Sequence, residues 1–175
     1  MKRISLFFSF LLLGALVTPA AFAATSGTSN VTLAASGSAQ IQVVDNTLTL
    51  SPTSVDYDNG YVQASGASGL RVNVMTNSTT GLVLMVRCSD ASPQIALADL
   101  LVRTQTAPGT GGTSMASYTP ITSSNQTLWT TGQAQHAWQS VVTDVKVQNL
   151  FNYDDGISAG TTNYTNTLTY TVVVQ

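Results

Sequence analysis

The sequence predicts an all-β domain, an immunoglobulin-like antiparallel sandwich with about seven to nine strands. Three observations favour this fold class. Short runs rich in Val, Ile, Leu and Thr recur along the chain, turn residues separate them at fairly regular spacing, and no helical signal of crossover length lies between them. A closed barrel remains the alternative.

The chain begins with the features of a cleaved secretory signal peptide, which we place at residues 1–23. Lys2 and Arg3 precede an apolar run over residues 6–17, and small residues follow at 21–23. No other stretch is apolar for long enough to cross a bilayer, so we expect no stable membrane span in the mature protein. The expected location is therefore secreted: periplasmic, extracellular or at the cell surface.

The mature chain is long enough for one domain with its own core. We assign residues 24–37 to an N-terminal extension or a first strand, and residues 38–175 to the β-sandwich domain. Expected strands in its first half are 39–44, 47–50, 54–57, 70–76 and 82–88. Residues 77–81 are expected to join the last two strands as a hairpin.

The second half is less regular. Residues 95–102 fit a short helix or a strand equally well. Residues 104–127 are rich in Gly, Ser, Thr and Pro and predict a long surface loop, crossed by a short strand near 118–121. One or two strands are expected within 136–147, and a closing strand follows within 164–174.

Period-two alternation also predicts which side chains form the core, because successive residues of a strand point to opposite faces. The expected core residues are Leu70, Val72, Val74, Leu82, Leu84, Val86, Val145, Val147, Leu168, Tyr170 and Val172.

Composition excludes several classes of partner. The chain has no glutamate, and beyond the signal peptide its only cations are Arg71, Arg87, Arg103 and Lys146. Nucleic acid and anionic membrane surfaces require clustered Lys and Arg, so neither is an expected partner. A surface of low charge instead permits close association with copies of itself or with other secreted surface proteins. Cys88 is the single cysteine, so it has no intrachain partner and is expected to be a buried, inert thiol.

Catalytic patterns are weak, and we expect no enzymatic activity. His136 is the only histidine, and no Gly-x-Ser-x-Gly element accompanies it. We expect no cofactor, with calcium as the one metal to consider. Oxygen ligands occur in two turn-like clusters, Asp56 with Asp58 and Asp154 with Asp155, although Asp also favours such turns without a metal.

Aromatic residues offer a different kind of site. Trp129 and Trp138, with Tyr118, Tyr153 and Tyr164, could supply a platform for sugar rings. This makes a secreted carbohydrate-binding module the alternative function, calcium-dependent if the acidic turns bind that metal. The competing interpretation is that both tryptophans fill the core or its edges.

Two segments resemble secreted pilin-like subunits of the chaperone–usher and spore-coat type. Residues 159–172 carry a Gly, a Tyr shortly after it, and alternating Thr and apolar residues, while residues 39–57 contain an apolar pair leading into a Leu-x-Leu-x-Pro bend. The chain departs from that family where Ile41 and Val43 lie in a region often tied by a disulfide, and the 104–127 loop has no counterpart there.

The resemblance implies a structural or adhesive role, as a fibre or extracellular-matrix subunit. It also implies a groove beside the last strand, filled by the N-terminal extension of the next subunit through β-augmentation. The candidate residues for strand exchange are Val31, Leu33 and Ala35 in the extension, and Leu168, Tyr170, Val172 and Val174 in the last strand. The sequence ends inside this strand pattern, as an exposed edge awaiting a partner would. The alternative is that residues 30–35 form the first strand of their own sandwich, which would protect the edge.

Overall fold

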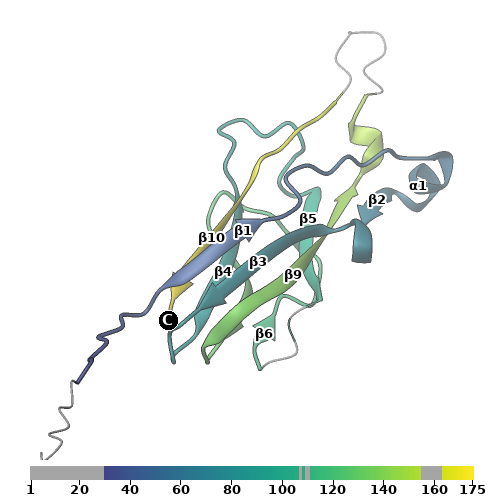
Figure 1. Cartoon of the computed structure of the whole chain (residues 1–175). Helices are drawn as coiled ribbons and strands as arrows, with labels where there is room; N and C mark the ends of the chain where they lie inside the picture. The colour runs from purple at the N-terminus through teal and green to yellow at the C-terminus, as the bar shows by residue number, and fades with distance from the viewer. Residues whose placement is uncertain (1–29, 107, 109–110, 155–162) are drawn as a thin grey trace, which may run out of the picture. The chain divides into compact units, whose positions relative to one another are not determined.

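A computed structural model describes residues 30–106, 108, 111–154 and 163–175. Residues 35–175 form a unit distinct from residues 1–34. This unit consists of two antiparallel sheets around one core, so the predicted all-β sandwich is confirmed and the closed barrel is not formed (Figure 1). Ten strands lie in the described residues, slightly more than predicted. The predicted signal peptide at 1–23 lies outside them, as do residues 24–29 of the extension.

The larger sheet is built around the longest strand, β9 (Gln135–Gln148). One edge of β9 pairs with β3 (Leu70–Thr76) and, further along, with β2 (Tyr61–Ala64). The sheet order is β1-β3-β9-β5-β7, with β1 (Ala39–Val43), β5 (Leu100–Thr106) and β7 (Thr119–Pro120) completing it. The segment expected at 136–147 is thus a single strand, and the short strand expected near 118–121 is present.

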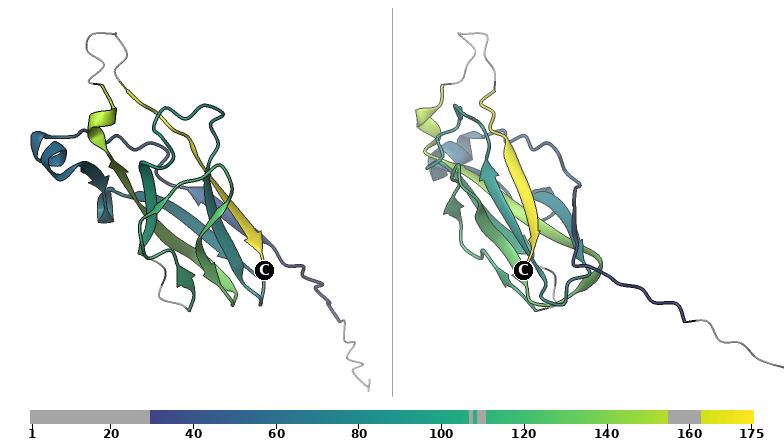
Figure 2. Two further views of the ribbon diagram at one scale, coloured as in Figure 1. Left: turned by 180° about the vertical axis from the view of Figure 1, so that it is seen from behind. Right: turned by 90° about the vertical axis from the view of Figure 1, so that its left-hand side faces the viewer.

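The smaller sheet has the order β10-β4-β8-β6, and it places the last strand at an edge. Its members are β10 (Leu168–Val174), β4 (Leu82–Cys88), β8 (Gln126–Thr131) and β6 (Thr113–Ser114). Figure 2 shows the two layers from behind and from the side.

Every predicted core residue belongs to the core or packs against it. The eight from β3, β4 and β9 are buried, whereas Leu168, Tyr170 and Val172 of β10 pack against them half-buried. The ladder explains which face of β10 points inward, because Tyr170 pairs with Val86 and cross-strand partners share a face. Cys88 is buried as expected.

The predicted hairpin at residues 77–81 is wrong. β3 and β4 both alternate buried and less buried residues, but they belong to opposite sheets. Their connection therefore passes from one sheet to the other instead of forming a hairpin. Two strands that each have one apolar face can pair within one sheet or pack face to face from two sheets. Here the apolar face of β3 packs toward that of β4, so each buries the other. Gly81 makes the crossing possible with φ of 86°, a backbone conformation that favours glycine.

The strand predicted at 54–57 is a helix, α1 (Ser54–Asn59). The Asp56 carboxylate accepts hydrogen bonds from the Thr53 backbone N–H and hydroxyl, each at 2.7 Å, and Gly60 ends the helix in a left-handed conformation. This is a capping-box arrangement with a glycine C-cap. Local capping therefore prevails over the weak strand propensity of four residues.

Other boundaries also differ from prediction. Residues 47–50 and 30–38 belong to no strand, so β1 is the first strand of the sandwich. Of residues 95–102, only those from Leu100 onward are regular, as the start of β5. The predicted 104–127 loop is shorter, because β5 and β8 extend into it and β6 crosses it. Two short 3₁₀ turns, η1 (Gly66–Ser68) and η2 (Leu150–Asn152), complete the fold.

Within the described part of the chain, no helix has the length and apolar character needed to cross a membrane.

Two glycines with similar backbone angles should respond differently to alanine. Gly60→Ala meets no atom within 4 Å and should cost only the left-handed strain, about 1–2 kcal/mol of unfolding free energy. Gly81→Ala should cost more than about 3 kcal/mol, because its Cβ would collide with the Thr131 carbonyl oxygen and the β3–β4 crossing cannot shift without parting the sheets. Urea denaturation of both variants tests this, and equal losses would contradict it.

Candidate functional site

The two sheets meet at one margin through edge strands that do not pair with each other. β1 is the edge of the larger sheet and β10 is the edge of the smaller one, and they lie side by side (Figure 1). Within the described residues, β1 pairs only with β3 and β10 only with β4. Each strand therefore has one edge whose backbone N–H and C=O groups form no ladder hydrogen bonds with another described strand.

The inward-facing side chains of both edge strands are poorly covered. Val43 of β1 is 46% exposed although its ladder partner Val72 is 0% exposed. Val174 of β10 is 38% exposed, and its partner Leu82 is likewise 0% exposed. The other inward-facing side chains of these strands pack against the core, so cover is lost at Val43 and Val174, where each strand ends.

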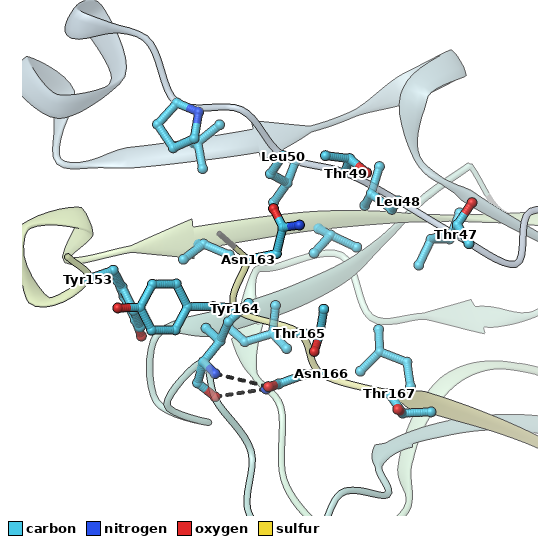
Figure 3. A pocket seen from close by; sticks show the side chains of 18 of the residues that line it. Thr47, Leu48, Thr49, Leu50, Tyr153, Asn163, Tyr164, Thr165, Asn166 and Thr167 are labelled. Carbon is cyan, nitrogen blue, oxygen red and sulfur yellow. Dashed lines mark hydrogen bonds between the residues drawn. The ribbon is translucent and has the colours of Figure 1, made fainter. Parts of the chain in front are cut away.

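A groove of about 880 Å³ opens where β1 ends. Residues 47–50 run along one side of it and residues 163–167 along the other (Figure 3). Its floor consists of core residues that retain 4–8% exposure, among them Val62, Leu70, Leu100, Val145 and Val147. The groove is therefore a direct opening into the hydrophobic core.

The 47–50 side of the groove has a strand-like sequence without a strand partner. Leu48 and Leu50 are half-buried and line the groove, whereas Thr47 and Thr49 are exposed, which is the alternation expected of a strand. No hydrogen bond of the described structure involves a backbone group of these four residues. The prediction of a strand here failed because the structure offers it no neighbour.

The 163–167 side is held in place by side chains. Asn166 accepts a hydrogen bond from the Ile95 N–H at 2.9 Å and donates one to the Ile95 carbonyl at 2.7 Å. The Thr165 N–H donates to Gln94 Oε1 at 2.8 Å. These bonds connect the segment to the loop between β4 and β5 in place of a strand ladder. They fix the position from which the chain enters β10, and Figure 3 shows those made by Asn166.

Two tyrosines lie at the far end of the groove, and a buried carboxylate positions one of them. Asp99 is 6% exposed and accepts hydrogen bonds from Asn149 Nδ2 at 2.6 Å and from Tyr153 Oη at 2.9 Å. Tyr153 packs edge-on against Tyr164, with 5.1 Å between ring centroids. Burial, reinforced by Asp99, raises the pKa of Tyr153 to about 12.

Tyr170 brings an unsatisfied hydroxyl to the floor of the groove. Its Oη and the Oγ1 of Thr143 from the opposite sheet are both buried, and neither atom has a hydrogen-bond partner in the described structure. Burial raises the pKa of Tyr170 to about 12, and Thr143 offsets part of that rise.

The strand-exchange candidates fall into two groups. Leu168 and Tyr170 line the groove, and Val172 and Val174 continue the same inward face of β10. Val31 and Leu33 are 96% and 87% exposed, Ala35 is exposed, and none of the three lies in a strand.

The tryptophans and the aspartates of the other predicted sites belong to different elements, as far as the structure describes them. Trp129 is fully buried in β8 and Trp138 is an exposed residue of β9 in the other sheet, so they form no common platform for a sugar. Asp56 caps α1, Asp58 and Asp154 are exposed, and Asp155 lies outside the described residues. Among the residues that are described, no three His, Cys, Asp or Glu side chains group as metal ligands would.

Sequence reasoning missed most of the groove. The Leu-x-Leu alternation at 48–50 signalled a strand but not that its partner would be absent. Tyr153 precedes the Asp-rich turn and Tyr164 follows it, and no local pattern indicates that their rings pack together. Comparison with models of protein families, with characterised proteins and with solved structures finds no match to this chain. The groove itself must therefore carry the functional argument.

The two buried tyrosines should respond oppositely to loss of the hydroxyl. Tyr170→Phe removes an unpaired buried group and should leave the free energy of unfolding unchanged or raise it by about 1 kcal/mol. Tyr153→Phe removes a hydrogen bond to a buried carboxylate and should cost about 1–3 kcal/mol. Urea denaturation at pH 7 measures both, and a large loss in Tyr170→Phe would contradict the unpaired state.

Stability should also fall steeply at high pH. The unfolded phenols ionise near pH 10, whereas the folded Tyr153 and Tyr170 stay neutral to about pH 12, so the unfolded state binds fewer protons between these values. The more deeply buried Tyr170 should then remove up to about 1.4 kcal/mol of stability per pH unit in that window, and Tyr153 less, because solvent screens its interactions. Denaturation at pH 10 and pH 11 should show a shallower loss in Tyr170→Phe, and an identical slope would contradict the raised pKa.

Proposed function

We propose that the chain is a secreted, non-enzymatic structural or adhesive subunit that associates by strand complementation, with residues 30–35 of one copy occupying the groove of another. The observation that carries this proposal is the 47–50 segment, which has strand alternation, lines an apolar groove and makes no backbone hydrogen bond in the described structure. A strand laid into the groove would complete both margins at once.

The backbone of the groove suits such an occupant. The free edge of β10 and the 47–50 segment present donors and acceptors that water satisfies in the isolated subunit. An inserted strand would exchange these bonds for a ladder, with a net gain of roughly 0.5–1.5 kcal/mol per bond. Because the ladder is made by main-chain groups, it supplies affinity without demanding a particular sequence.

The side chains of residues 30–35 supply the specificity. Val31, Leu33 and Ala35 alternate with Thr32 and Ala34, so one face of the strand is apolar and would point to the groove floor. Burying Val31 and Leu33 is worth roughly 1.5–3 kcal/mol each. Part of this gain is lost to the cost of association, so a single short strand should bind weakly as a free peptide.

The surface of the chain does not oppose such contact. The formal net charge of the full chain, signal peptide included, is only −2, and no lysine or proline of β10 blocks its edge. The same exposed edges in a subunit without a partner would be an aggregation hazard, which favours a role in which they are covered. Other secreted surface proteins with a comparable extension would fit the same groove.

The test uses the mature protein and matched substitutions in its extension. Leu33→Asp should abolish concentration-dependent assembly, because it places a charge on the apolar floor. Thr32→Asp adds the same charge on the opposite face of the strand and should assemble like the unchanged protein. Analytical ultracentrifugation and electron microscopy report the assembly.

A peptide of residues 28–36 tests the acceptor separately. With Kd on the order of 10⁻⁴ M, about 1 mM peptide should stabilise the Leu33→Asp protein against unfolding by about 1.4 kcal/mol, and a peptide carrying the same substitution should not. The proposal fails if the mature protein stays monomeric at high concentration, or if Leu33→Asp assembles as well as Thr32→Asp.

A further inference from the structure

A second site lies on the outer face of the larger sheet, away from the core. Four side chains gather there, and we refer to them with Gln63 as the Lys146 cluster: Tyr61, Arg103, Tyr118 and Lys146. Arg103 Cζ lies 4.5 Å from the centroid of the Tyr118 ring. Lys146 Nζ lies 4.7 Å from the Tyr61 centroid and 5.1 Å from the Tyr118 centroid, so the ammonium stands between two rings.

The sheet register brings these residues together. Gln63 of β2 and Leu101 of β5 both pair with Lys146 of β9, so the three share the outer face. Tyr118 comes from the loop before β7, and its hydroxyl lies 3.3 Å from Gln63 Oε1. Leu101 is only 7% exposed despite facing outward, which shows that the cluster is packed and not a set of free surface side chains.

One carboxylate adjoins the cluster, and other groups already satisfy it. Asp144 is fully buried, pairs with Arg103 across the β5–β9 ladder at 2.8 Å, and accepts a hydrogen bond from the Gly66 N–H at 2.9 Å. This pair fixes Arg103 against Tyr118. The Asp144 charge is thereby neutralised by Arg103 and not by Lys146.

Lys146 is left as an uncompensated charge. Across the described residues its ammonium forms no ion pair and no hydrogen bond, and the two aromatic rings only flank it. Of the other cations, Arg71 forms a bidentate pair with Asp45, and Arg87 lies exposed on the opposite sheet. In an acidic chain, the Lys146 cluster is thus a local excess of one positive charge held half-buried between aromatic walls.

We infer that the Lys146 cluster binds the carboxylate of an acidic sugar, such as a uronic acid unit of a polysaccharide. The Lys146 ammonium would donate charge-assisted hydrogen bonds to the carboxylate. The Tyr61 and Tyr118 rings would contact the apolar face of the sugar ring, and the exposed Gln63 amide would bind its hydroxyls. This site is independent of strand complementation.

A sugar acid fits these features better than an acidic peptide does. A polyanion gains affinity from many cations, and this cluster offers one uncompensated charge with no second one nearby. A sugar acid combines a single carboxylate for Lys146 with a ring face for the tyrosines and hydroxyls for Gln63. Of the aromatic residues that the sequence offered as a sugar platform, only Tyr118 belongs to this site.

The experiment measures binding of trigalacturonate to the mature protein by calorimetry and by chemical-shift changes at Tyr61 and Tyr118. Lys146→Met keeps the aliphatic stem and removes the charge, and it should weaken binding at least tenfold. Arg87→Met makes the same change in net charge on the other sheet and should alter affinity less than twofold. Lys146→Arg retains the cation and should restore binding, which separates loss of the site from loss of the fold.

Three comparisons decide the outcome. Neutral galactotriose should bind far more weakly, and raising the salt from about 20 mM to about 300 mM should weaken trigalacturonate binding only modestly, because one charge is involved. Absence of saturable trigalacturonate binding would overturn the inference. So would equal losses in Lys146→Met and Arg87→Met, or polyaspartate binding as tightly as trigalacturonate, which would indicate an acidic peptide.

Discussion

The contact between two alternating apolar strand faces is the interaction on which the rest of the structure depends. The inner faces of β3 and β9 pack against those of β4 and β8, with Trp129 as the largest fully buried side chain. Because β3 and β4 are consecutive but lie in opposite sheets, the chain must pass from one sheet to the other at residues 77–81. β1 joins β3 in one sheet and β10 joins β4 in the other, so the two sheets meet at a margin where neither edge strand has a second ladder partner in the described residues.

An open margin is costly for a protein of this composition. Edge strands are usually protected by lysine, proline, bulges or a covering segment, and β10 has only threonine and valine on its outward face. Val43 and Val174 remain partly exposed on the inner face as well. A chain with so few charges cannot rely on repulsion to keep copies apart. The margin is therefore either a liability or an interface, and the unpaired 47–50 segment beside it favours an interface.

Period-two alternation was sufficient to predict the sandwich, much of its core and the strands β1, β3, β4 and β10, because each has apolar residues at every second position. Alternation could not show whether β3 and β4 are hydrogen-bonded neighbours in one sheet or face each other from opposite sheets, since both arrangements bury the same side chains. The α1 helix depended on the Thr53–Asp56 capping pair, a short-range signal that a strand pattern of four residues obscured. The groove and the Lys146 cluster arise from residues distant in sequence, such as Tyr61 with Tyr118, and no local pattern relates them.

The position at which the extension joins the sandwich distinguishes complementation within one copy from complementation between copies. Asn77 holds the chain at this point by accepting from the Ser38 N–H and donating to the Ser36 carbonyl, and a Cβ on Gly37 would lie 3.5 Å from Val174. The N-terminal extension thus meets the sandwich next to the C-terminal end of β10. To enter its own groove it would have to turn back at Gly37, run antiparallel to β1 and lie parallel to β10. An extension from another copy is not tied at Asn77 and can enter the groove without this reversal of the chain. The tie at Asn77 therefore favours exchange between copies over closure within one.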